Sequence, residues 1–311
     1  MQTPRGESWF IGLASILLLL GAGWLSARIG LSRLYSEYAI VTASIAAAET
    51  AIRLSPTDPQ AHFARAAALA DREQSDEAIA EFQRAIKLKP RDYYFWLKLA
   101  RTEDWAGKER EARQSFAAAV QLAPFYAAPR WELGNLLLRA GEPQQAFAEL
   151  RRAADSNTLL LPAVIDLAWN TFNGDRARIQ EAVNSRAPEA QLALARYFSK
   201  RGRVNDTLAF LDAAGNEEAA EERQILLSEL FYQRRYPEAY QVWLSRPEMR
   251  KQKLNSVQGT MTNGGFEGEL TLEKEPWFDW HLGNVTETNV KAALDPNHPR
   301  EGQRSLRLEW A

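Results

Sequence analysis

The chain has 311 residues, of which 46% are hydrophobic and 25% are charged, and its formal net charge is −2. This composition is ordinary for a folded protein, and the small net charge gives no general attraction to nucleic acid or to anionic lipid. The absence of cysteine excludes disulfides and thiolate metal sites, and it fits a reducing or an oxidising compartment equally. We therefore expect no nucleic-acid partner.

The first expected element is a membrane-spanning helix over residues 9–27. Twenty uncharged, mostly apolar residues lie between Glu7 and Arg28, and about 20 residues of helix cover the roughly 30 Å hydrocarbon core of a bilayer. Trp9 and Trp24 stand near the two ends, where indoles favour the membrane interface. A cleaved signal peptide is the main alternative, but it would have a more basic start. A buried core helix would show a polar face, which this run lacks.

The middle of the chain repeats with a period of 34 residues. Four sets of residues share this step: Ala78, Ala112 and Ala146; Ala85, Ala119 and Ala153; Pro56, Pro90 and Pro124; Leu99 and Leu133. A 34-residue period with these residue types resembles the tetratricopeptide repeat. The resemblance implies pairs of helices stacked into an α-solenoid with a concave groove.

The sizes of the repeated side chains predict how the helices pack. Small residues let the first helix of each pair approach its neighbour closely: Ala66, Ala100 and Gly134. Large residues fill the space between the pairs: Phe82, Phe116 and Leu150. The prolines end each second helix and turn the chain into the next unit. The best repeats are residues 57–90, 91–124 and 125–158.

We expect the solenoid to span residues 30–246, with a degenerate part over 159–246. The unit after residue 158 lacks about two helical turns, and a last pair of helices covers 219–246. Upstream, residues 39–56 predict the second helix of a first unit. The first helix of that unit is expected to continue from the membrane helix.

The resemblance implies that a protein or peptide partner binds in the groove, and that the fold itself is not catalytic. The groove positions name six candidates for a peptide site: Tyr94, Arg101, Trp105, Trp131, Asn135 and Arg139. Phe63, Leu97 and Asp104 occupy further groove positions. Aromatic and arginine side chains are typical of binding hot spots and suit an extended acidic or aromatic peptide. The alternative, that these side chains only pack on neighbouring helices, stays open.

We find no sequence pattern typical of a catalytic or metal site. His62 falls at a core position of the repeat, where we expect it to be packed. His281 and His298 lie far apart and have no second histidine at metal-ligand spacing. A phosphate loop, a nucleophile elbow and a paired-histidine zinc helix are also missing. The sequence therefore predicts neither an enzyme nor a cofactor.

The C-terminal part changes character. Residues 247–262 predict a linker, and residues 263–311 predict alternating strands in "GELTLE", "PWFDWHL", "NVKAAL" and "SLRLEW". The "NGGFE" motif and the later "GQRSLRL" strand resemble the start of carbohydrate-binding-module-like jelly-roll sandwiches. That resemblance implies a glycan partner, with Trp277 and Trp280 as candidates for stacking on a sugar. Because such a sandwich needs about eight strands, we expect the chain to be truncated at residue 311.

Together these elements predict a mainly α protein: residues 1–29 as tail and transmembrane helix, the solenoid, the linker, and a partial β-sandwich. The leading functional hypothesis is a non-enzymatic scaffold in the inner membrane of the bacterial envelope, linked by analogy to exopolysaccharide assembly or export. The sandwich resemblance favours a periplasmic or extracytoplasmic soluble part. Arg28 and Arg33 favour a cytoplasmic one instead. A second hypothesis is a fragment of a larger envelope enzyme whose catalytic part lies beyond residue 311.

Overall fold

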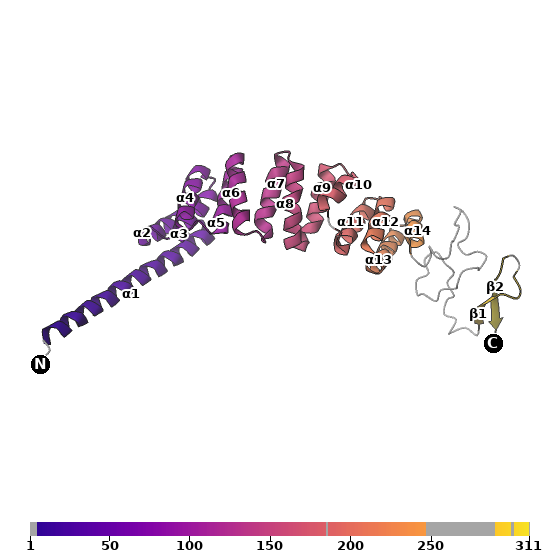
Figure 1. Cartoon of the computed structure of the whole chain (residues 1–311), viewed down its shortest axis with the longest axis horizontal. Coiled ribbons are helices and arrows are strands. Elements are labelled where there is room, and N and C mark those ends of the chain that lie inside the picture. The colour runs from indigo at the N-terminus through magenta and orange to yellow at the C-terminus, as the bar shows by residue number, and fades with distance from the viewer. Residues whose placement is uncertain (1–4, 185, 247–289, 300–301, 311) are drawn as a thin grey trace. The chain divides into compact units, whose positions relative to one another are not determined.

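The computed structural model describes residues 5–184, 186–246, 290–299 and 302–310, and this part of the chain is mostly helical, as predicted (Figure 1). The chain divides into two compact units, Met1–Val164 and Ile165–Ala311. The first unit contains these helices: α1 (Arg5–Thr42), α2 (Ile45–Leu54), α3 (Pro59–Ala70), α4 (Ser75–Leu88), α5 (Tyr93–Trp105), α6 (Glu109–Leu122), α7 (Ala127–Arg139), α8 (Pro143–Ser156) and the short 3₁₀ helix η1 (Thr158–Leu160).

The 34-residue period is visible in the helix boundaries. The first helices of the three best repeats begin at Pro59, Tyr93 and Ala127, and the second helices begin at Ser75, Glu109 and Pro143. The aspartates before α3 and α5 cap them, because each carboxylate accepts a hydrogen bond from the amide two residues later, at 3.0 Å. Each pair is an antiparallel helical hairpin that packs on the next pair. The predicted solenoid is therefore present.

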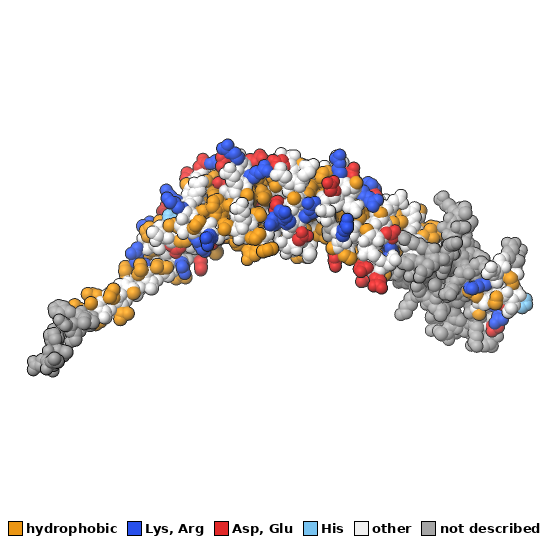
Figure 2. Space-filling model, viewed as in Figure 1, with side chains coloured by type: hydrophobic (Ala, Val, Ile, Leu, Met, Phe, Trp, Pro, Cys, Tyr) orange, Lys and Arg blue, Asp and Glu red, His pale blue; other side chains and the backbone are white. Residues whose placement is uncertain are grey.

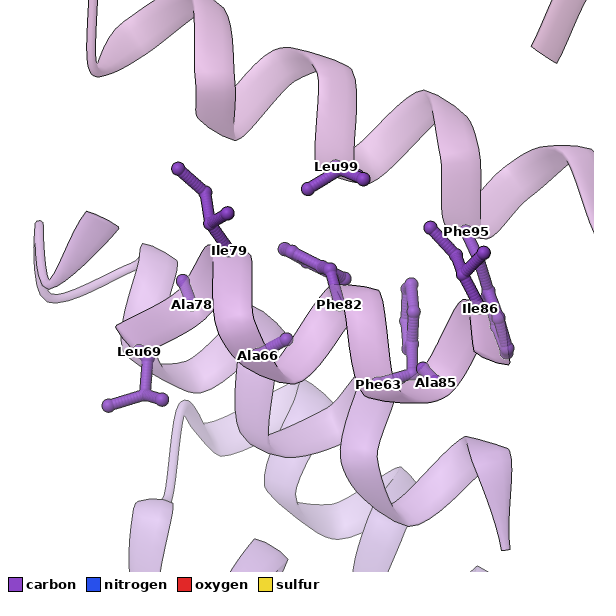
Figure 3. Packing of buried hydrophobic residues seen from close by; sticks show 10 residues of the cluster. All are labelled: Phe63, Ala66, Leu69, Ala78, Ile79, Phe82, Ala85, Ile86, Phe95 and Leu99. Carbon is purple, nitrogen blue, oxygen red and sulfur yellow. The ribbon is translucent and has the colours of Figure 1, made fainter. Parts of the chain in front are cut away.

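The core of the first unit contains the residues that the repeat predicts. Phe82, Phe116 and Leu150 are at most 1% exposed, and Ala66 and Ala100 are fully buried. Figure 3 shows Phe82 projecting from α4 between α3 and α5. Gly134 of α7 approaches α8 so closely that an added Cβ would lie 2.6 Å from Leu150 Cγ. The small and large positions are thus complementary, as we expected.

Helix α1 is continuous over 38 residues. Its N-terminal part is apolar, and the span Leu13–Thr42 is long and apolar enough to cross a membrane by length and composition. Its C-terminal part packs against α2 and α3, where Ser32 and Ser36 are fully buried. As predicted, the first helix of the first pair continues from the apolar segment.

One boundary prediction was wrong, because residues 39–42 belong to α1 and not to the second helix of the first unit. The chain turns at Ala43, which has a left-handed φ of 51°, and α2 begins at Ile45. Ala39 is fully buried and packs with Ala47, Ala48 and Ala64, so it extends the first helix by one more turn.

The second unit is built from α9 (Leu161–Thr171, which begins just before the boundary) and five further helices: α10 (Arg176–Val183), α11 (Pro188–Lys200), α12 (Val204–Ala214), α13 (Glu218–Tyr232) and α14 (Tyr236–Leu244). Helix α10 has eight residues where α8 has fourteen, which confirms the shortened unit. The last pair, α13 and α14, buries Leu226, Ala239 and Trp243 as expected.

The described C-terminal residues form an antiparallel hairpin of β1 (Val290–Asp295) and β2 (Ser305–Trp310). Val290 pairs with Trp310 and Asp295 with Ser305, so both of the last two predicted strands are present. The linker at 247–262, the first two predicted strands, His281 and the glycan candidates Trp277 and Trp280 lie outside the described residues.

Candidate functional site

A cavity of about 650 Å³ lies between α3 and α5 in the first unit. Helix α3 contributes Ala67 and Ala70, with Asp71 directly after it, and α5 contributes Lys98, Arg101, Thr102 and Trp105. Glu73 and Ser75 lie at one end, where the chain enters α4, and Phe82 of α4 forms part of the wall. Two of the six predicted peptide-site residues, Arg101 and Trp105, are therefore part of one hollow.

The hollow results from a difference in side-chain size at equivalent repeat positions. Ala67 and Asp71 lie 34 residues before Arg101 and Trp105, so they occupy the equivalent positions of the preceding repeat. The short side chains of α3 leave room beside the long side chains of α5. Trp105, in the last turn of α5, is 89% exposed. An exposed indole beside a cavity is a surface that gains free energy when a ligand covers it.

Tyr94 lies at the N-terminal end of the same helix, α5. Its ring is 42% exposed, and its centroid is 5.6 Å from that of the buried Phe63. The ammonium group of Lys98 lies 5.6 Å from the Tyr94 ring centroid, within cation–π range. Tyr94, Lys98 and Trp105 thus present polar and aromatic groups along one helix.

The other three predicted residues are on α7 and do not line the cavity. The Asn135 side chain donates a hydrogen bond of 2.8 Å to the carbonyl of Trp131, one turn earlier in its own helix. Arg139 pairs with Asp104 of α5 at 2.5 Å. The second salt bridge between these helices joins Arg101 to Glu132, also at 2.5 Å.

These two ion pairs change the expected electrostatics of the groove. Each arginine that we expected to attract an acidic peptide has a carboxylate partner on the adjacent first helix. The α5–α7 part of the groove is therefore close to neutral. The cavity itself has both signs of charge, with Asp71 and Glu73 at the α3 end and Lys98 on α5.

Two groove positions from the sequence analysis are core positions in the structure. Phe63 and Leu97 are each only 3% exposed. The Phe63 ring stacks on Phe95 with a centroid distance of 4.8 Å, and Leu97 packs with Leu133 and Leu136. Both side chains are covered by the next first helix, so neither can contact a ligand in the groove.

His62 is packed, as expected, but its role is specific. Its Nδ1 lies 2.7 Å from a carboxylate oxygen of Glu81 and its Nε2 lies 3.0 Å from the carbonyl of Pro56. At the same place in the next two repeats, Trp96 Nε1 donates to the Pro90 carbonyl and Arg130 Nε donates to the Pro124 carbonyl. Position 62 therefore stabilises the loop between repeats, a role that its residue type alone did not indicate.

Burial raises the pKa of three groups in the described part of the chain: Tyr93, Glu103 and Tyr197. Glu103 faces away from the cavity and is 4% exposed, and this burial raises its pKa, although a hydrogen bond with Ser115 acts in the opposite direction. In the second unit, burial and a hydrogen bond to Asp166 raise the pKa of Tyr197 to about 12. Among the described residues, no cluster of three His, Cys, Asp or Glu side chains could hold a metal ion.

The family model of the tetratricopeptide repeat matches residues 59–102, which cover α3, α4 and most of α5. No curated protein matches the chain. Solved structures with similar folds include pilF of Pseudomonas aeruginosa, with 16% identity over 65% of this chain and 98% of that one, and a TM-score of 0.44.

Two further structures have the same kind of similarity. YrrB, described as a tetratricopeptide-repeat protein with an unusual peptide-binding site, is 16% identical over 58% of this chain and all of its own, with a TM-score of 0.38. MamA of Desulfovibrio magneticus RS-1 is 18% identical over 50% of this chain and 92% of its own, with a TM-score of 0.44. The matched segment and the 34-residue spacing of the helices show that the chain carries tetratricopeptide repeats.

Proposed function

We propose that the chain is a non-enzymatic, membrane-anchored scaffold that binds an extended segment of a partner protein in the cavity between α3 and α5. The observation that carries this proposal is the 650 Å³ hollow beside Trp105, a side chain that is 89% exposed. Large aromatic side chains at rigid helical positions are the usual anchors of protein interfaces. Here the Trp105 side chain lies beside a cavity that a ligand side chain can fill.

The chemistry of the lining defines the partner segment. Part of the lining is apolar, with Ala67, Ala70 and Phe82 beside Trp105, and this part accepts an apolar or aromatic side chain that also covers the indole. Lys98 offers a positive charge on α5, and Asp71 and Glu73 offer negative charge at the α3 end. A segment with an apolar residue flanked by one acidic and one basic residue matches these three features.

The membrane anchor in this proposal is the N-terminal part of α1, on the basis of its length and apolar composition. We place the solenoid in the periplasm or outside the cell, and we link the protein to exopolysaccharide assembly or export with a glycan as a second partner. Support for this placement comes from the sequence motifs at 263–308. Trp277 and Trp280 remain the proposed stacking residues.

A selection of random peptides tests the proposed site. The full chain in detergent micelles is immobilised, peptides are selected on it, and their dissociation constants are measured by fluorescence titration. Truncation of a hot-spot tryptophan costs about 2 kcal/mol or more, so Trp105→Ala should weaken the selected peptides by about 30-fold. Leu159→Ala is the matched control, because Leu159 is 85% exposed and lies outside the cavity.

Peptides whose affinity falls with Trp105→Ala and not with Leu159→Ala would support the proposal. Failure to select any peptide, or selected peptides that bind the Trp105→Ala variant equally well, would overturn it. Membrane anchoring is tested separately by alkaline extraction of membranes from expressing cells. An integral anchor keeps the chain in the pellet, whereas a chain in the supernatant contradicts the anchor.

A further inference from the structure

The C-terminal part of α1 carries an apolar face that nothing in the first unit covers. Ser32, Ser36 and Ala39 face α2 and α3 and are fully buried. A different face of the same helix exposes four large apolar side chains, with exposed fractions between 47% and 85%: Leu31, Leu34, Tyr38 and Val41. Figure 2 shows hydrophobic side chains along the described part of α1.

These four residues are spaced by three, four and three positions, which is the a/d spacing of a coiled-coil seam. The pattern is informative here because polar side chains interrupt this part of the helix, and Arg33 and Glu37 both fall outside the seam. The same register continues towards the N-terminus through residues of the apolar segment: Leu17, Leu20, Trp24 and Ala27. The seam thus contains no charged residue over about four heptads.

Contact with lipid does not explain why the C-terminal half of this face, from Leu31 to Val41, is apolar. The guanidinium of Arg28 donates to the Leu54 carbonyl at the C-terminal end of α2, at 2.8 Å, so the packed solenoid already begins at this level of the helix. Val41 lies 13 residues further along the helix, which corresponds to about 20 Å. In a solenoid, the outer face of the first repeat is normally polar. Here it is apolar and has heptad spacing.

We propose that a second copy of this chain covers the face, through a parallel two-helix coiled coil of α1 from both copies. The seam is self-complementary, as a twofold interface requires, because Leu34 meets Leu34 and Val41 meets Val41 of the other copy without opposing charges. The proposal rests on the membrane anchor proposed above. Two anchors in one bilayer hold the helices parallel and at high effective concentration.

Gly23 and Gly30 flank the seam in the two parts of the helix. A Cβ added at either glycine would meet no atom of the chain within 4 Å, so packing inside this chain does not require glycine there. Small residues beside a membrane seam allow two helix backbones to approach closely. The glycines therefore agree with a helix partner along the same line.

Disulfide cross-linking in native membranes tests this interface, because the chain has no cysteine of its own. Single cysteines are placed in the seam, by Leu34→Cys and Val41→Cys, and outside it, by Arg33→Cys and Glu37→Cys. All four side chains are exposed on one helix. Arg33 also lies 4.0 Å from Asp58, the cap of α3, so Glu37→Cys is the control that leaves the contacts of the solenoid unchanged. Membranes are oxidised with copper phenanthroline and analysed on non-reducing gels.

We expect a band at twice the monomer mass from the two seam variants and no such band from the two control variants. A cross-linked band of another mass means that a different protein covers the face, and the absence of any cross-linked band means that nothing covers it. Either result overturns the proposal. Equal dimer bands from all four variants mean random collision and overturn it too. Alkaline extraction of the same membranes tests the anchor separately. If the chain is extracted and still forms a seam-specific dimer, the membrane anchor is contradicted and the coiled coil is supported.

Discussion

The contact between Gly134 and Leu150 allows the packing of the best repeats to be tested by one methyl group. In the two preceding repeats, the equivalent pairs are Ala66 with Phe82 and Ala100 with Phe116. Only the third repeat has glycine at the small position. Gly134→Ala would add a Cβ 2.6 Å from Leu150 Cγ, 2.8 Å from Leu150 Cδ2 and 3.2 Å from the backbone oxygen of Ala146.

Two opposing effects set the expected magnitude. Alanine is a better helix former than glycine by about 1 kcal/mol. Overpacking a well-filled core costs about 1–3 kcal/mol. The clash involves a side-chain branch point and a backbone oxygen, neither of which moves easily. The steric cost should therefore prevail and leave a net loss of up to about 2 kcal/mol. A domain of this size loses about 2–4 °C in melting temperature for each kcal/mol.

The assay is thermal unfolding of the full chain in detergent, followed by circular dichroism at 222 nm, for a cycle of variants. Leu150→Ala opens the space that the added methyl needs, so in that background Gly134→Ala should raise the melting temperature. The sign of the Gly134→Ala effect therefore reverses between the two backgrounds. Stabilisation of the original chain by Gly134→Ala, or the same sign in both backgrounds, would refute this account of the packing.

Three further predictions concern single residues. Glu73 has a left-handed φ of 62° at the turn where the next two repeats have glycine, so Glu73→Gly should stabilise the chain by about 1 kcal/mol in the same unfolding assay. Burial raises the pKa of Glu103, so its contribution to stability falls as pH rises through that pKa, and Glu103→Gln should raise the melting temperature at pH 7 more than at pH 4. Tyr197 should ionise near pH 12 in an ultraviolet titration, with its stabilising effect lost between pH 10 and 12, and Asp166→Ala should lower that pKa.

The helical architecture could be predicted because the residue types that recur in each repeat are those that pack against one another. Each small position, such as Ala66, faces a large one, such as Phe82, and the 34-residue step places every such pair. Gly107 and Gly141 also keep the 34-residue step, and in the structure both lie at turns with left-handed φ values, of 72° and 76°. Glu73 performs the same turn without glycine, so residue type alone could not reveal it.

The position of the candidate site was only partly predictable. The groove spacing identified Arg101 and Trp105, but the hollow also depends on Ala67, whose importance appears only when adjacent helices are compared. The same comparison, applied to the sequence, would have found it. The neutralisation of Arg139 by Asp104 depends on how far each helix is offset from the next, which the repeat period does not specify.

The central claim, that the α3–α5 cavity is the surface occupied by a partner, is tested most directly by photo-cross-linking in intact cells. Benzoylphenylalanine is placed at Lys98 or Trp105, which line the cavity, and at Phe125 or Leu159, which are each 85% exposed outside it. The account predicts a discrete adduct from positions 98 and 105, abolished by an excess of a peptide selected on the purified chain, and none from 125 and 159. Adducts from 125 and 159 alone, or equal adducts from all four positions, would contradict it.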